Sequence, residues 1–516
     1  MLRSEEQRCI GGDYMSDTTA GPAAQPGHIT GFGSRGYRTY VLMSLMLVYT
    51  LNFIDRSLIG VVGQPIMDSF GLSDAQWGLL NGPPFALFYA LMGIPIAMWA
   101  DRGNRVFIIG LCIIIWSIMT ALCGLAAGFI WLLLFRVGVA IGEAGCTPPA
   151  NSLITDYYPP KSRANALGIY SMGVTIGGVL AQLFGGTIAS IKGPDMGNWL
   201  HSLGLGFMFD HLNWETVEGW RIAFVVIGTP GVLIAALIWF TMKEPPRGHS
   251  DAPSLHIEKA GILEAFKEFG RKPTFWTLSL GAAFVAFVGY GLFAFQTPFL
   301  MRVHGVSLHD AAVKFGAPLS AVAAGGTFLG GYLAEKLSHR FPAVSAWLPG
   351  VGLLIAVPAY SIAFLTSSLT VAIFFWVIAA VTHYAYLGAQ YTVGTGIVSP
   401  RARATTISVL LFIVALIGNG IGPMFTGWMS THFMSSSLAA QGLSDQFATF
   451  EPKFCGVNVE QLGADGPALC SAYAEGLRHS MVATVMIFII AAAFYFLAAR
   501  TFMRDRYDPA APSGQG

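Results

Sequence analysis

Charge is scarce in this sequence. Only 11% of its 516 residues are charged, whereas soluble domains carry about 25%, so a soluble globular enzyme is excluded. The net charge of +1 gives no reason to expect DNA or another polyanion as a partner. The six cysteines lack the spacing of metal ligands, and neither a Ser/His/Asp set nor a phosphate-binding loop is present. We therefore expect no enzyme chemistry, no metal or cofactor and no nucleic-acid partner.

Apolar residues, by contrast, make up 54% of the chain. A helix needs about 20 apolar residues to cross the ~30 Å hydrocarbon core of a bilayer. Twelve stretches meet this requirement, at about 39–65, 75–100, 106–127, 129–154, 164–190, 220–242, 275–301, 309–334, 343–366, 370–397, 403–431 and 478–503. The predicted fold class is an all-α membrane protein with twelve transmembrane helices.

Lysine and arginine set the expected orientation, because they are enriched in cytoplasmic loops. With twelve spans both termini share one side, and most of the 29 basic residues fall there. The opposite side holds only Lys192, Arg221, Arg302, Lys314, Lys453 and Arg478. We expect a multi-pass protein of the cell (inner) membrane with cytoplasmic N- and C-termini.

Two cytoplasmic motifs recur, which indicates two six-helix bundles of parallel topology. Asp101 and Arg102 close the second span, and Glu335 closes the eighth in the equivalent place. The segment 160–164 before the fifth span resembles 400–404 before the eleventh. The predicted organisation is a tail (1–36), an N-terminal bundle (37–243), a linker (244–272), a C-terminal bundle (273–505) and a second tail (506–516).

The linker contains a short amphipathic stretch. Its apolar residues are Ile257, Ile262, Leu263, Phe266 and Phe269, separated by Glu and Lys. We interpret it as a helix on the membrane surface that connects the two bundles.

The motif at Asp101 is similar to the loop signature of the major facilitator superfamily, G-x-x-x-D-[RK]-x-G-[RK]. Ala97 stands where that signature has its first glycine, and Gly103-Asn104 depart from its order. The resemblance implies a secondary transporter of twelve helices. It also implies a conformational gate at Asp101 and Arg102, with Glu335 as its counterpart in the second half.

Four further motifs resemble the Spinster subfamily. They are Asn52–Arg56 (N-[YF]-x-D-R), Arg136–Glu143 (R-x6-E), Tyr157–Arg163 and Gly219–Phe224. The resemblance implies a proton-linked carrier of lysophospholipids or sphingosine-phosphate-like lipids. It also implies proton-coupling roles for Asp55 and Glu143 and substrate binding by Arg136.

The same three residues stand out on physical grounds, because a charge at the bilayer centre costs about 2.5–3.5 kcal/mol. At 1.5 Å per residue, Asp55 and Arg136 lie at similar depth, which predicts that they pair. Glu143 lies two turns deeper, with no evident basic neighbour. Arg136 suits a phosphate or carboxylate, whereas we interpret Arg56 as extending to the outer boundary. The alternatives are a purely structural Asp–Arg lock and a Glu143 that stays protonated.

The second half is poorer in charge. The offset that relates its motifs to those of the first half places His383 opposite Glu143 and Trp376 opposite Arg136. We take His383, Tyr384 and Gln296 as candidate substrate-binding residues, although a histidine among aromatic residues is more often a packing contact. The first half carries the charged residues and the second half offers apolar and aromatic walls. This arrangement suits an amphipathic substrate.

The predicted function is proton-coupled transport of an anionic, lipid-like substrate by alternating access, driven by the proton gradient without a cofactor. We expect a monomer whose partners are that substrate, protons and membrane lipids. Two alternatives remain: a transporter of small organic anions or drugs, and a non-transporting lipid receptor or scramblase. The sequence leaves open whether Cys455 and Cys470, in the long loop after the eleventh span, form a disulfide.

Overall fold

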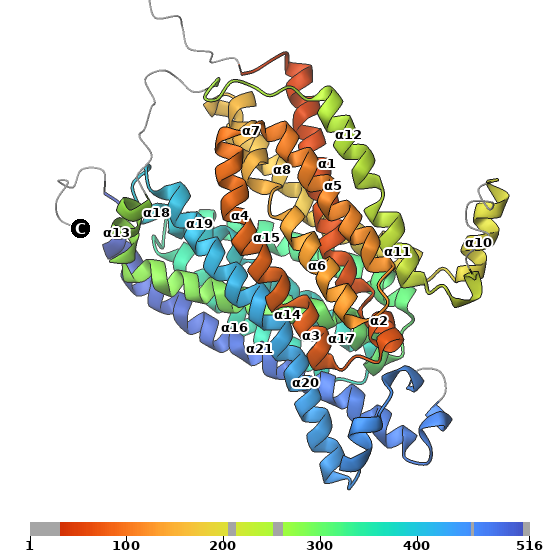
Figure 1. The fold of residues 1–516 in the computed structure, drawn as a ribbon. Helices are drawn as coiled ribbons and strands as arrows, with labels where there is room; N and C mark the ends of the chain where they lie inside the picture. Colours follow the sequence, from red (N-terminus) through yellow and green to blue (C-terminus); the bar gives the residue numbers. More distant parts are fainter. Residues whose placement is uncertain (1–30, 205–212, 251–261, 456–458, 509–516) are drawn as a thin grey trace, which may run out of the picture.

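The computed structural model describes residues 31–204, 213–250, 262–455 and 459–508. Twelve helices in these ranges are long and apolar enough to cross a membrane, and each overlaps a predicted span. The all-α fold of two helical bundles is therefore confirmed (Figure 1).

The N-terminal half contains the first six spans. Its elements are α1 (Arg35–Val61), α2 (Gly63–Phe70), α3 (Asp74–Asn81), α4 (Pro83–Arg102), α5 (Arg105–Gly124), α6 (Phe129–Glu143), α7 (Thr147–Tyr157), α8 (Pro160–Leu180), η1 (Ala181–Gly185), α9 (Gly186–Ala189), α10 (Gly193–Ser202), η3 (Trp214–Thr216), α11 (Gly219–Gly228) and α12 (Pro230–Thr241).

The C-terminal half repeats this plan after the linker. Its elements are α13 (Ile262–Gly270), α14 (Pro273–His304), η4 (Asp310–Gly316), α15 (Ala317–Ser338), α16 (Val344–Leu365), α17 (Leu369–Tyr384), α18 (Tyr386–Gly396), α19 (Arg403–Val414), η5 (Ala415–Asn419), α20 (Gly420–Ala440), η6 (Ser444–Thr449), η7 (Pro452–Phe454), η8 (Val459–Leu462) and α21 (Gly466–Asp505).

Glycines bring the helices close together. A Cβ atom on Gly177 of α8 would lie 2.6 Å from the carbonyl oxygen of Thr50 on α1. A Cβ atom on Gly422 of α20 would lie 2.2 Å from the carbonyl oxygen of Phe287 on α14. Side chains at these positions would force the helices apart, as expected where small residues line a helix interface.

The fourth span is broken at its centre. Pro148 and Pro149 occupy the first turn of α7, where proline is tolerated because the missing N–H has no partner there. The preceding helix α6 ends at Glu143, so this carboxylate lies at the break inside the bundle.

The two halves are joined at one end of the molecule. We call the end that carries the start of α1 and the end of α21 the terminal side, and the opposite end the loop side. On the loop side, Trp77 of α3 donates a hydrogen bond from Nε1 to the carbonyl oxygen of Ala294 on α14 (3.0 Å). Ala75 donates from its backbone N–H to Thr431 Oγ1 on α20 (3.1 Å). Within the described ranges, the hydrogen bonds between the halves all lie toward this side, so the structure is closed there.

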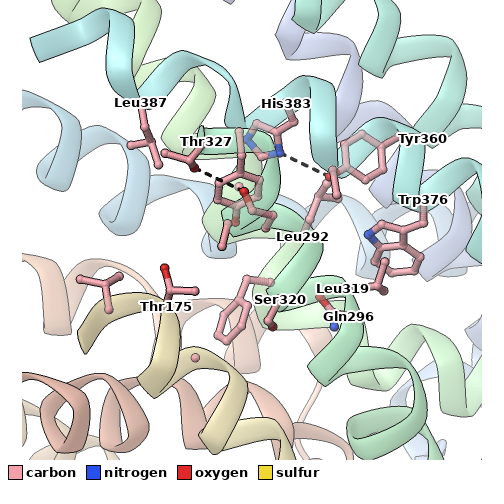
Figure 2. A pocket seen from close by; sticks show the side chains of 18 residues that line it. Thr175, Leu292, Gln296, Leu319, Ser320, Thr327, Tyr360, Trp376, His383 and Leu387 are labelled. Carbon is pink, nitrogen blue, oxygen red and sulfur yellow. Dashed lines mark hydrogen bonds between the residues drawn. The ribbon is translucent and has the colours of Figure 1, made fainter. Parts of the chain in front are cut away.

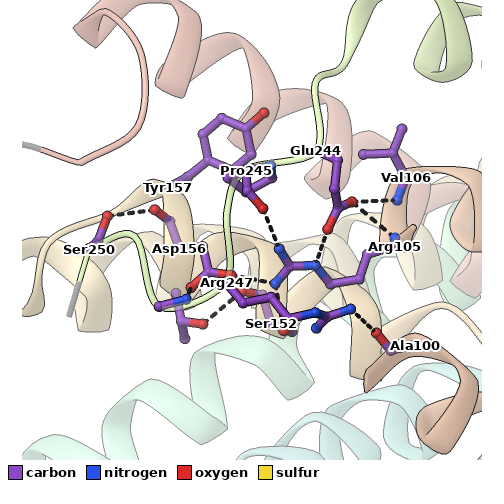
Figure 3. A network of polar contacts seen from close by, with 12 residues as sticks. Ala100, Arg105, Val106, Ser152, Asp156, Tyr157, Glu244, Pro245, Arg247 and Ser250 are labelled. Carbon is purple, nitrogen blue, oxygen red and sulfur yellow. Dashed lines mark hydrogen bonds and ion pairs between the residues drawn. The ribbon is translucent and has the colours of Figure 1, made fainter. Parts of the chain in front are cut away.

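The described parts of the linker attach to different halves. Its first residues lie against the N-terminal half, where Glu244 binds Arg105 (Figure 3). Its helix α13 lies against the C-terminal half, where Glu268 accepts hydrogen bonds from Ser399. Phe269 of α13 is buried, whereas Phe266 is 45% exposed, as expected for an amphipathic helix. Ile257 lies outside the described residues.

A small cap extends beyond the bundle on the loop side. It comprises the described residues between 434 and 477, where the ends of α20 and α21 enclose a separate apolar cluster (Figure 1). Cys455 and Cys470 form a disulfide in this cap, which settles the question that the sequence left open. The cap reaches the N-terminal half as well, because η7 packs against α2.

Candidate functional site

The intramembrane charges pair differently from the prediction. Arg56 of α1 donates from Nε to Oε2 of Glu143 on α6 (2.9 Å), and its Nη2 lies 2.8 Å from the same oxygen. The Glu143 side chain is fully buried, and that of Arg56 is 15% exposed. Both earlier interpretations are therefore wrong: Glu143 has a basic partner, and Arg56 faces the interior.

Asp55 and Arg136 are both buried, but within the described part of the chain they do not form the predicted ion pair. Asp55 lies near Thr120 and Trp116 of α5, and Arg136 is close enough to act on its charge but does not form an ion pair with it. The depth estimate gave the height of each residue in the bilayer but not the direction in which it points around the helix axis. Asp55 is buried and Arg56 is largely buried, although neighbouring residues point about 100° apart around the helix axis.

Arg136 carries a buried positive charge with no carboxylate partner in the described chain. Its Nε atom is also without a hydrogen-bond acceptor. The ring of Phe85 on α4 contacts the guanidinium, with its centroid 4.8 Å from the guanidinium carbon. A buried cation is retained only where something compensates it, so Arg136 is suited to bind an anion.

An aromatic wall on α1 and α4 surrounds the Arg56 guanidinium. Its carbon lies 4.6 Å from the ring centroid of Tyr89, 5.1 Å from that of Phe53 and 5.3 Å from that of Phe85. Such cation–π contacts contribute about 2 kcal/mol when they are desolvated. Phe85 thus contacts both guanidinium groups, a role for which the sequence carried no motif.

The predicted residues of the second half line a separate cavity of about 200 Å³ (Figure 2). His383, Tyr384 and Gln296 all contribute to its wall, so the structure brings these three together. Most of the remaining wall is apolar or aromatic, and Thr175 of α8 closes it from the N-terminal half. The cavity therefore lies between the halves, as an alternating-access site requires.

Two features of this cavity bear on polar recognition. The ring of His383 is buried and its Nδ1 lies 3.3 Å from the Tyr360 hydroxyl, which ties the histidine to its own half. The amide nitrogen of Gln296 has no hydrogen-bond partner in the structure. Gln296 is therefore free to donate to a bound molecule, whereas His383 is already engaged. The three charged residues Asp55, Arg136 and Glu143 do not line this cavity.

The predicted gate residues lie on the surface at the terminal side. Asp101, Arg102 and Glu335 are exposed and take part in none of the described ion pairs. The buried network of this region centres instead on Arg105, which the sequence analysis did not single out (Figure 3). Arg105 binds Asp156 at the end of the fourth span and Glu244 of the linker.

An ion pair between the halves lies on the loop side. Asp74 of α3 and Arg302 of α14 form a bidentate ion pair with both N–O distances at 2.8 Å. Ser430 of α20 donates to Asp74, and the ring of Tyr473 in the cap lies 3.8 Å from the Arg302 guanidinium carbon. This pair joins residues far apart in the sequence, so no local pattern could have revealed it.

Comparison with known proteins agrees with this architecture. Residues 45–423 match the family described as Major Facilitator Superfamily. An MFS-type efflux pump of Mycolicibacterium smegmatis is 32% identical over 77% of this chain and 86% of its own, and a hexuronate transporter of Bacillus subtilis is 26% identical over 78% and 91%. A crystal structure of a bacterial homologue of the human lysosomal transporter Spinster, inward-facing and unoccupied, is 71% identical over 93% of this chain and all of its own, with a TM-score of 0.89.

Proposed function

The chain belongs to the Major Facilitator Superfamily and is related to Spinster, and from this premise we propose that it couples proton movement to the transport of an anionic amphipathic molecule. A lysophospholipid or a sphingosine-phosphate-like lipid has the required form, an anionic headgroup on an apolar tail. The observation that carries the proposal is the uncompensated Arg136 guanidinium near the Arg56–Glu143 pair. One buried cation is open to an anion while a second is held by an acid that can take up a proton.

The proposed mechanism assigns each group one task. Ionised Glu143 binds Arg56. A proton on Glu143 removes the negative charge and releases Arg56, which then binds the substrate anion together with Arg136. Asp55 is the second proton carrier, because it is buried without a basic partner among the described ion pairs. When the halves rock together on the terminal side, the gate there is formed by the exposed residues Asp101, Arg102 and Glu335.

The substrate tail would occupy the cavity between the halves. Its wall is mainly apolar and aromatic, which favours an acyl chain over a sugar. Gln296 and Tyr384 offer the few polar contacts at this end. One chain supplies both the cations and the cavity, which supports a monomeric transporter without a cofactor. The excess of basic residues on the terminal side supports cytoplasmic termini in the cell membrane.

A second candidate is transport of a sugar acid or another small organic anion. The similarity to a hexuronate transporter favours it, because one arginine suffices to bind a carboxylate. This candidate predicts a site confined to the charged residues, with no contribution from the apolar cavity.

Transport into proteoliposomes distinguishes these functions. The purified protein is reconstituted with a pH gradient of either direction and offered lysophosphatidylglycerol, sphingosine phosphate or glucuronate. We expect gradient-dependent movement of a lysolipid that responds to the direction of the gradient. Movement of glucuronate alone would replace the proposal with the second candidate, and lipid flux insensitive to the gradient would indicate a scramblase.

A further inference from the structure

Between the fifth and sixth spans, the described elements α10 and η3 pack against each other outside the bundle, and we refer to these two elements together as the hairpin. Helix α10 packs on Trp214 of η3, which fills the inner face of the hairpin. Two glycines make this contact possible: a Cβ atom on Gly193 would lie 2.0 Å from the Trp214 carbonyl oxygen, and one on Gly197 would lie 2.8 Å from its ring. The face of α10 that carries Gly193 and Gly197 is therefore already covered by Trp214.

A second face of α10 is apolar. At 100° per residue its apolar side chains fall within an arc about 100° wide, which contains Met196, Trp199, Leu200 and Leu203. The polar side chains occupy another arc, formed by Asp195, Asn198, His201 and Ser202. Trp199 is 56% exposed and Leu203 is 53% exposed. These two side chains of the apolar arc therefore point away from the described protein, whereas Met196 and Leu200 are partly buried.

The position of the hairpin indicates what covers this arc. The fifth span ends at Ala189 and the sixth begins at Gly219, so α10 starts only four residues beyond the hydrophobic region. Among the described elements only η3 packs extensively against α10, and Figure 1 shows the helix apart from the bundle beside α11. A short amphipathic helix with an exposed tryptophan at this depth has the properties of an interfacial membrane helix.

We propose that α10 binds the loop-side leaflet of the bilayer, with Trp199 and Leu203 inserted among the lipid chains and its polar arc toward water. The contact is made by apolar area and by the tryptophan ring at the headgroup level. The helix thereby attaches the N-terminal half to the leaflet. This inference is independent of the transported substrate.

Site-specific fluorescence tests the contact directly. The native cysteines permit selective labelling, because Cys112, Cys123 and Cys146 are buried, Cys455 and Cys470 are disulfide-bonded, and Cys9→Ser removes the remaining thiol. Trp199→Cys and Leu203→Cys place an NBD label on the apolar arc. Asn198→Cys, an exposed neighbour, places it on the polar arc as a matched control. The labelled proteins are reconstituted at low protein density in phosphatidylcholine vesicles with or without lipids that carry a doxyl quencher on the acyl chain.

We expect labels at 199 and 203 to show blue-shifted emission and at least threefold stronger quenching by doxyl lipid than the label at 198. Equal quenching at the three positions, or none at any of them, would overturn the proposal. A blue shift at 199 without lipid quenching, lost on further dilution of the protein, would also overturn it and identify a second copy of the chain as the occupant.

Discussion

Arg56 binds Glu143 through two nitrogen atoms on one carboxylate oxygen, inside the N-terminal half and next to the break in the fourth span. Two helical turns earlier on the same helix, Arg136 has an aromatic ring instead of a carboxylate. The site thus contains one compensated and one uncompensated guanidinium. In the proposed coupling, a proton on Glu143 changes Arg56 from the compensated to the uncompensated state, so that it can bind the substrate anion.

Removing one member of the buried pair should destabilise the protein more than removing both. Glu143→Gln leaves the Arg56 cation without its carboxylate, and a broken buried pair typically costs about 3–5 kcal/mol. The aromatic wall compensates part of the charge, so we expect a loss toward the lower end. Thermal unfolding in detergent of Glu143→Gln, Arg56→Gln and the double variant measures this. A double variant as unstable as the sum of the two single variants would show that the residues do not interact.

The Asp74–Arg302 pair should hold the loop side closed. Asp74→Asn removes the charge on one side of the contact between the halves, and we expect the population to shift toward a loop-side-open state. Spin-label distances across the loop side report this shift. The matched control is Asp310→Asn, which removes an exposed ion pair with Lys314 within the C-terminal half. Unchanged distances in Asp74→Asn would refute the assignment.

Asp68 of α2 should make closure of the loop side depend on pH. Burial raises the pKa of its carboxyl above the ordinary value of 3.8, although Arg302 and a hydrogen bond from Gln64 oppose the shift. If opening the loop side exposes Asp68, the closed state is favoured below pH 3.8 and loses this stabilisation as the pH rises through the raised pKa. Nearby Asp74 and Glu218 act in the same direction as burial.

Replacing Asp68 with Asn should therefore flatten this part of the pH dependence and increase closure at neutral pH. The same spin-label distances, recorded from pH 4 to 8 for the parent and Asp68→Asn, give the measurement. Identical pH profiles for the two proteins would contradict the role of Asp68.

The disulfide should stabilise the cap locally. Cys455 and Cys470 are 15 positions apart, and closing a loop of this size contributes about 3 kcal/mol in the chain-entropy model. We expect the Cys455→Ser/Cys470→Ser variant to be cleaved faster by protease between residues 441 and 466 while its twelve spans stay folded. Since Tyr473 of the cap contacts Arg302, the variant should also open more readily on the loop side. Equal cleavage rates would show that the disulfide does not restrain the cap.

The twelve spans could be predicted because the length of an apolar run is a local signal. The close approach at Gly177 and the helix break near Pro148 also have local causes, since small residues and prolines act on their immediate surroundings. The partners of Arg56 and Arg136 were not. They depend on how α1 and α6 are rotated about their axes, which tertiary packing decides.

The loop-side contact illustrates the same limit. Asp74 and Arg302 lie in different halves, and each alone resembles an ordinary loop charge. The gate motif at Asp101 drew attention to exposed residues, whereas the buried Arg105 a few positions later has the interactions. Residue type and position identified the regions of interest, but only the folded structure identified the pairs.

The most direct test of proton coupling through Glu143 separates proton movement from substrate exchange. Proteoliposomes containing a pH-sensitive dye and the transported lysolipid are compared for the parent and Glu143→Gln, with Glu264→Gln, an exposed acid on α13, as the control. The account predicts substrate-dependent proton movement in the parent and the control. In Glu143→Gln it predicts at least a tenfold loss of proton movement, while exchange of labelled for unlabelled lysolipid continues. Proton movement by Glu143→Gln at the parent's rate would contradict it.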